Sequence, residues 1–263
     1  MSAVHQRTRR AGLIVAAALA LALAIALALV LGPVLDADGP GGPAAAEPPD
    51  RRPALRLAQR AGLVSVGIEV RADGLRAALY PPEIDLPAPR VTRLALSADG
   101  APAQDLRAAG CGDGCVQSRA PVPTGSIVLD VEVEYAERTR TARFRFPWPL
   151  PPGAGPLLAR AVSASAGVPR VRVVERVTSD PEEGVYVNPP RIVAGEDLAD
   201  MYGVGGARDV RELPARPGLR RVAYALPEVP LWVEVWIAAD GRIVRDRFVS
   251  ETRLWTQEYM SPP

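Results

Sequence analysis

The segment SIVLDVEVEYAERTRTARFRFPWP, residues 126–149, has apolar side chains at every second position near both of its ends. Apolar residues alternate with mostly acidic ones from Ile127 to Tyr135, and Phe144 and Phe146 repeat the same spacing. Successive side chains of a β-strand point to opposite faces, so a period of two predicts strands with one buried and one solvated face. The stretch therefore predicts β-structure that packs on one side only.

The residues before this stretch show the same strand pattern, interrupted by turn signals. In LVSVGIEVRADGLRAALYP, residues 63–81, alternating segments lie on either side of Asp73-Gly74, a typical hairpin turn. A second Asp-Gly pair ends the segment RVTRLALSADG. Short strands separated by turns, without a long helix, are typical of a small antiparallel sandwich. We therefore predict an Ig-like β-sandwich over residues 55–148.

A proline-rich linker, residues 149–156, is predicted to separate this sandwich from a second domain, residues 157–263. Proline donates no backbone hydrogen bond and ends a strand. A short amphipathic helix follows and should end at Gly167, because glycine is the typical C-cap residue. The predicted buried face of this helix consists of Leu157, Leu158, Ala161, Val162 and Ser165.

The rest of the second domain is predicted to form a curved antiparallel sheet wrapped on that helix. Alternation indicates a strand near residues 171–176. Residues 232–238 and 242–249 flank an Ala-Asp-Gly segment with the chemistry of a hairpin turn, and a third strand is expected at about residues 252–259. Residues 180–217 are rich in turn residues without a regular pattern and receive no assignment. The predicted fold class is mainly β (α+β).

Residues 11–35 contain no charged side chain and predict a transmembrane anchor. As a helix they would span about 37 Å, against a hydrocarbon core of about 30 Å. Arginines precede the segment, so residues 1–10 are expected in the cytoplasm and the remainder outside, with the bilayer as a partner of residues 11–35. Residues 36–54, rich in Pro, Gly and Ala, are a predicted linker. The alternative is a cleaved signal peptide, although the apolar segment exceeds the usual length.

The inventory of reactive side chains argues against catalysis outside the cytoplasm. All 31 basic residues are arginine, and the sole histidine, His5, precedes the predicted anchor. The exported part therefore lacks the residues for a Ser-His-Asp or Cys-His arrangement and for a Schiff-base lysine. Glu196, Asp197 and Asp200 leave a carboxylate-dependent wall hydrolase as an alternative. We predict no catalytic residue, no cofactor and no metal site. Past the anchor, 28 arginines (31 minus the three before it) stand against 30 acidic residues, and this net charge of about −2 predicts no nucleic-acid partner.

The only two cysteines, Cys111 and Cys115, lie in the glycine-rich segment GCGDGC. Thiols outside the cytoplasm oxidise, and the glycines allow a loop tight enough for the two sulfurs to meet. A thiol–disulfide enzyme usually has Cys-x-x-Cys at the start of a helix, and a two-thiolate metal site needs further ligands. We predict a disulfide at a hairpin tip, with the redox pair and the metal site as alternatives.

Three tryptophans, Trp232, Trp236 and Trp255, fall on adjacent predicted strands of the second domain. Large aromatic side chains on a sheet pack into the core. They also line apolar concavities that hold a lipid, a peptide or a partner strand. We therefore predict either a core position for the three or a shared surface for an apolar ligand or a partner.

Two groups of segments resemble known families. GCGDGCVQSRAPVPTGSIVLDVEVEY, FRFPWPLPP and LLARAV resemble the extracytoplasmic part of actinobacterial proteins of the CopC/CopD and YtkA-like type. VRVVERVTS and PLWVEVWIAADGRIVRDRFVSETRLWTQEYMSPP resemble the LolA/LppX-like curved-sheet module, here shortened. The resemblance spans about residues 64–263 and implies an Ig-like sandwich followed by a shortened LolA-like module. It implies no copper site, because CopC-like proteins bind copper through histidines that the exported part does not supply.

Together these observations predict a membrane-anchored, extracytoplasmic, non-enzymatic protein that binds an envelope protein or an apolar ligand. The alternative is an accessory protein of copper homeostasis without a histidine copper site of its own. That alternative requires Cys111 and Cys115 to be free thiols.

Overall fold

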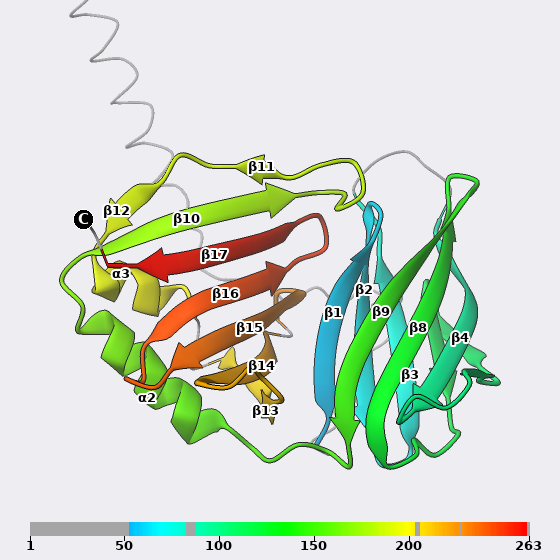
Figure 1. Ribbon diagram of the computed structural model, residues 1–263. Helices are drawn as coiled ribbons and strands as arrows, with labels where there is room; N and C mark the ends of the chain where they lie inside the picture. Colours follow the sequence, from blue (N-terminus) through cyan, green and yellow to red (C-terminus); the bar gives the residue numbers. More distant parts are fainter. Residues whose placement is uncertain (1–52, 83–87, 203–205, 227, 262–263) are drawn as a thin grey trace, which may run out of the picture. The chain divides into compact units, whose positions relative to one another are not determined.

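The computed structural model describes residues 53–82, 88–202, 206–226 and 228–261 (Figure 1). The predicted cytoplasmic tail and anchor, and all of the predicted linker except its last two residues, lie outside these ranges. Within them, no helix is both long and apolar enough to cross a membrane. The chain is mainly β, with antiparallel sheets throughout, which confirms the predicted class.

The first half of the described chain forms two antiparallel sheets that share one core. One sheet has the order β1-β2-β3-β7-β6 and the other the order β5-β4-β8-β9. The bounds are β1 Leu55–Ala61, β2 Val64–Arg71, β3 Gly74–Tyr80, β4 Arg90–Ala98, β5 Gln104–Asp105, β6 Ala109–Gly112, β7 Cys115–Ser118, β8 Gly125–Tyr135 and β9 Arg138–Trp148. We call these nine strands the sandwich. Their inward side chains, mostly Val, Leu, Ile and Ala, form a single apolar cluster.

The alternating segment, residues 126–149, forms β9 and all of β8 except its first residue. The two strands pair from Gly125↔Trp148 to Tyr135↔Arg138. The predicted period of two is confirmed, because the apolar positions of both strands are buried. The buried set is Ile127, Leu129, Val131, Val133, Ala142, Phe144 and Phe146. The register places Asp130 opposite Arg143 on the other face, which the solvent reaches.

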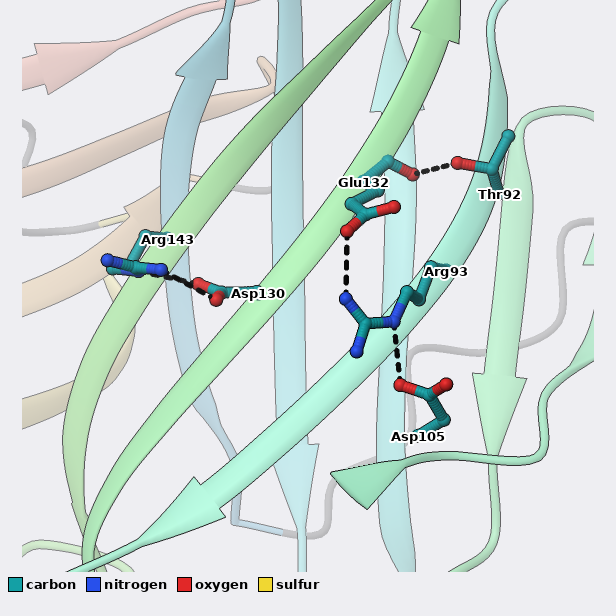
Figure 2. A network of polar contacts seen from close by, with 6 residues as sticks. All are labelled: Thr92, Arg93, Asp105, Asp130, Glu132 and Arg143. Carbon is teal, nitrogen blue, oxygen red and sulfur yellow. Dashed lines mark hydrogen bonds and ion pairs between the residues drawn. The ribbon is translucent and has the colours of Figure 1, made fainter. Parts of the chain in front are cut away.

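Ion pairs cover that solvated face (Figure 2). The Arg143 guanidinium binds Asp130 through two bonds of 2.7 and 2.8 Å. Arg93 bridges Asp105 at 2.6 Å and Glu132 at 3.0 Å. Exposed pairs of this kind contribute little to stability, because the solvent screens them. They satisfy the charges of the polar strand positions.

The second half forms an eight-stranded antiparallel sheet of order β11-β10-β17-β16-β15-β14-β13, with β12 also paired to β10. The bounds are β10 Val171–Thr178, β11 Tyr186–Val187, β12 Arg191–Val193, β13 Arg208–Leu213, β14 Leu219–Leu226, β15 Leu231–Ala238, β16 Ile243–Val249 and β17 Leu254–Met260. The predicted hairpin around Asp240-Gly241 is β15–β16, and the predicted third strand is β17. We call this sheet the large sheet.

Two helices lie on one face of the large sheet (Figure 1). Helix α2, Gly155–Ala166, buries four of the five residues predicted for its inner face, and Gly167 is its C-cap. Val162, the fifth, is partly buried against the same core. Helix α3, Gly195–Asp200, contributes Leu198 to this core. We call this side of the sheet, which includes Val233 and Val235, the helix face.

The opposite side of the large sheet contacts the sandwich, and we call it the sandwich face. Trp232 and Val249 of this face pack with Ala58 of β1 in a small apolar cluster. Leu213 and Ala223 of the large sheet belong to the core of the sandwich itself. Residues 51–263 therefore form one compact unit. The unassigned segment 180–217 contains β11, β12, α3 and all of β13, whose short lengths explain why no periodicity was visible.

Candidate functional site

The helix face of the large sheet opens at one edge into a groove of about 580 Å³. Its volume lies within the range of about 300–1,000 Å³ that is typical of small-molecule sites. The groove has an apolar wall, a polar end and a lip.

The apolar wall consists of Met201, Val229, Leu231, Phe248 and Trp255. Phe248 and Trp255 are directly opposite each other on β16 and β17, so their rings share the helix face. Met201 and Val229 are exposed at the rim, with Val229 56% exposed. An apolar rim that no other described segment covers is available to a ligand.

The polar end consists of Glu175, Arg191 and Gln257. The Glu175 carboxylate accepts hydrogen bonds from the side-chain amides of Asn188 and Gln257, the latter at 2.5 Å. An Arg191 guanidinium nitrogen lies 3.8 Å from Glu175 Oε2. These groups are positioned by the register of β10 and β17, which places Glu175 opposite Gln257.

A buried acid, Asp246, lies behind the polar end. It follows the same period of two as Phe248, and it accepts hydrogen bonds from the hydroxyls of Tyr202, at 3.1 Å, and Tyr259. The Tyr259 hydroxyl also lies 2.6 Å from Gln257 Oε1, which connects the buried acid to the groove. Burial, the largest cause, raises the pKa of Asp246 to about 7, although the tyrosine hydrogen bonds oppose the shift. A polar residue in phase with buried neighbours was the signal in the sequence that could have identified this position.

The three tryptophans for which a shared surface was one of two predictions do not lie on one surface. Trp255 lies in the groove, whereas Trp232 and Trp236 point to the sandwich face, because Trp232 pairs with Val249 and Trp255 pairs with Phe248. Val249 and Phe248 are neighbours on β16 and therefore point to opposite faces of the sheet. The tryptophan opposite each of them lies on the same face as its partner. The shared surface expected from the sequence is therefore replaced by a groove that contains only Trp255.

Trp232 and Trp236 have structural partners in the described part of the chain. Trp232 packs edge-on against Tyr80 with ring centroids 5.0 Å apart. The guanidinium groups of Arg221 and Arg245 lie 5.4 and 4.9 Å from the ring centroid of Trp236. These contacts place both residues in packing between elements.

The predicted disulfide is confirmed: Cys111 and Cys115 are bonded, with Cα atoms 5.1 Å apart. The bond joins β6 to the first residue of β7 at the tip of their hairpin. The copper-homeostasis alternative needs free thiols at these positions. A closed disulfide offers no thiolate ligand, so the geometry disfavours that alternative.

The acidic side chains at residues 182–183 form ion pairs, and those at residues 196–197 lie at the start of a helix. Glu182 pairs with Arg140 at 2.9 Å, and Glu183 pairs with Arg138 at 3.6 Å. Glu196 and Asp197 occupy the first turn of α3, where carboxylates complement the helix dipole. Across the residues with described positions, no group of three or more His, Cys, Asp or Glu side chains is placed to hold a metal ion.

No family model matches this sequence, and no curated protein matches it significantly. The resemblance to CopC-like and LolA-like proteins stays a prediction. The groove is therefore the feature from which the function has to be argued.

Proposed function

We propose that this protein is a non-enzymatic binding protein that holds an amphiphilic small molecule, with an apolar chain and a polar head, in the groove of its large sheet. The observation that carries the proposal is the combination of an apolar wall and a polar end in one cavity of about 580 Å³. Ligand sites are typically apolar concavities with a few converging polar groups.

The size and the lining favour an amphiphile over a protein partner. A specific protein interface buries about 800 Å² on each partner, usually on a flat or gently curved surface. The groove is instead a concavity with two exposed apolar side chains, Met201 and Val229, at its rim. An acyl or isoprenoid chain fits against Phe248 and Trp255, while a polar head reaches Glu175 and Arg191.

The proposal includes an extracytoplasmic location with the chain anchored by residues 11–35. The disulfide between Cys111 and Cys115 supports this location, because disulfides persist in oxidising compartments. The two-sheet core supports an Ig-like sandwich, and the helix-covered large sheet supports a shortened LolA-like module.

Photocrosslinking in the host membrane tests the proposal on the full chain. Cells fed a fatty acid that carries a photoreactive diazirine would be irradiated, and the labelled residues of the purified chain mapped by mass spectrometry. We expect labels at two places, the anchor and the apolar wall. The anchor is the internal positive control, and a label confined to residues 11–35 would contradict the proposal.

A matched pair of variants makes this test specific. Val229→Arg places a charge at the groove rim, where a guanidinium next to an alkyl chain is unfavourable. We expect labelling of the apolar wall to fall at least fivefold. Val185→Arg is the control, because Val185 is 52% exposed, close to the 56% of Val229, and does not line the groove. Equal labelling in the two variants would show that the probe does not occupy the groove.

A further inference from the structure

The lip of the groove is the turn between β16 and β17, residues 250–253, of which Ser250, Glu251 and Thr252 line the groove. Its backbone is tied to the sandwich and not only to its own sheet. The tie is made by two buried residues of the sandwich, Arg60 on β1 and Ser65 on β2. Neither residue lines the groove.

Arg60 is 7% exposed and bonds three separate segments. One terminal nitrogen donates to Ser65 Oγ at 2.8 Å and to the Glu251 carbonyl at 2.9 Å. The other donates to the Leu63 carbonyl at 2.5 Å and to the Ser179 carbonyl. The Ser65 hydroxyl in turn donates to the carbonyl of Ser250. Two consecutive lip carbonyls are therefore held by the sandwich.

The Arg60 guanidinium can bond all of its acceptors only when they are held in one arrangement. A guanidinium is planar and presents its donors in a rigid fork, so it bonds several acceptors only when they are held in the matching arrangement. Burial lowers the pKa of Arg60 to about 10, so the group is charged at neutral pH. Removing it would take a donor from the hydroxyl of the buried Ser65 and release the carbonyls of Leu63, Ser179 and Glu251, which is unfavourable.

We infer that Arg60 and Ser65 are positioning residues for the groove: they hold the lip in its ligand-binding conformation, so that the sandwich is a working part of the ligand site. The inference rests on the proposed function. A site that is competent for only a fraction of the time binds its ligand more weakly by that fraction. Releasing the lip should therefore weaken binding although no ligand contact is lost.

The chain offers a matched control on the same strand. Arg56, also on β1, binds Asp209 of β13 at 2.7 Å and Glu69 of β2 at 2.9 Å. It ties the sandwich to the large sheet as Arg60 does, but to β13 rather than to the lip. Arg56→Met and Arg60→Met remove the same side chain from the same strand, so they separate a general loss of stability from a specific loss of lip order.

The experiment combines two measurements on the full chain in host membranes. Hydrogen exchange without added ligand reports lip order directly, and we expect at least tenfold faster exchange at residues 251–253 in Arg60→Met, with Ser65→Ala intermediate. Arg56→Met should leave this exchange unchanged. Crosslinking to the diazirine fatty acid, performed well below the unfolding temperature of every variant, should fall at least threefold in Arg60→Met and remain unchanged in Arg56→Met.

The other possible outcomes separate the positioning role of Arg60 from the proposed function. If the apolar wall of Arg60→Met is labelled as strongly as that of the parent chain, Arg60 does not position the lip, and the proposed function stands. If both arginine variants lose labelling and exchange protection equally, the effect is general stability and the inference is wrong. If the parent chain shows no label in the apolar wall, the proposed function fails and the inference fails with it.

Discussion

At the scale of single residues, Asp246 is the most informative side chain outside the groove lining. It is fully buried in the helix-face core, where the hydroxyls of Tyr202 and Tyr259 point at its carboxylate. Glu175 lies on β10, across the intervening strand β17, and its negative charge further raises the pKa of Asp246. An acid in this environment costs free energy whenever it is ionised.

The sign of the pH dependence follows from the raised pKa. The folded-state value is about 7 and the ordinary value is 3.8, so the unfolded chain loses this proton first as the pH rises. The contribution of Asp246 to stability therefore falls between about pH 4 and pH 7 and is constant above pH 7. The total change for this group is about 4 kcal/mol.

Asp246→Asn should remove this dependence, because the amide stays neutral and its oxygen still accepts from a tyrosine hydroxyl. We expect the variant to be more stable than the parent at pH 8, with a difference that shrinks toward pH 5. Denaturant unfolding at both pH values measures it. An unchanged pH slope would mean that Asp246 does not titrate in the way its burial implies.

At the scale of elements, the contact of β2 with β15 shows how the two sheet systems fit together. Gly67 of β2 faces Trp232, and a Cβ atom added there would lie 2.5 Å from a ring carbon of Trp232. Trp232 is also held by Tyr80 from the neighbouring β3. The glycine is required by the close approach of a large ring to the strand backbone.

Gly67→Ala should therefore destabilise the protein by about 1–3 kcal/mol, the usual cost of overpacking. Gly110→Ala is the control, because nothing lies within 4 Å of the added methyl group at that exposed hairpin position. Thermal unfolding followed by circular dichroism compares the two. Equal unfolding temperatures for both variants would contradict the tight packing of Trp232 on β2.

At the scale of the whole molecule, the sandwich and the large sheet share contacts of every kind. Leu213 and Ala223 enter the sandwich core, Arg247 bonds the side chain of Gln59, and Arg60 bonds the lip. The Arg56 guanidinium pairs with Asp209 at 2.7 Å and so joins β1 of the sandwich to β13 of the large sheet. The interface is therefore apolar and ionic at once and not a loose contact between independent domains.

We expect residues 51–263 to unfold in one cooperative transition, because breaking the interface would expose core residues of both sheet systems. Differential scanning calorimetry of the full chain tests this, and Gly67→Ala and Asp246→Asn should shift the same transition. Two separate transitions, each moved by one variant only, would show that the sandwich and the large sheet are thermodynamically independent.

Helix α3 and strands β11 to β14 have no sequence pattern that we could assign. Local patterns predict most of the other strands, helix α2, the main hairpins and the disulfide. Each of these depends on neighbours close in the chain: a period of two from Ile127 to Tyr135, an Asp-Gly turn, or two cysteines four residues apart. Such local patterns are set by backbone geometry and are visible without a partner.

The groove, its apolar wall and its lip follow from the tertiary structure alone. The register of β15, β16 and β17 separated Trp255 from Trp232 and brought Phe248 beside Trp255. The lip bonds of Arg60 join positions separated by 191 residues in the chain. A one-residue difference in register, or a pairing over such a separation, leaves no trace in local periodicity, because it depends on which strands meet and not on how each strand is built.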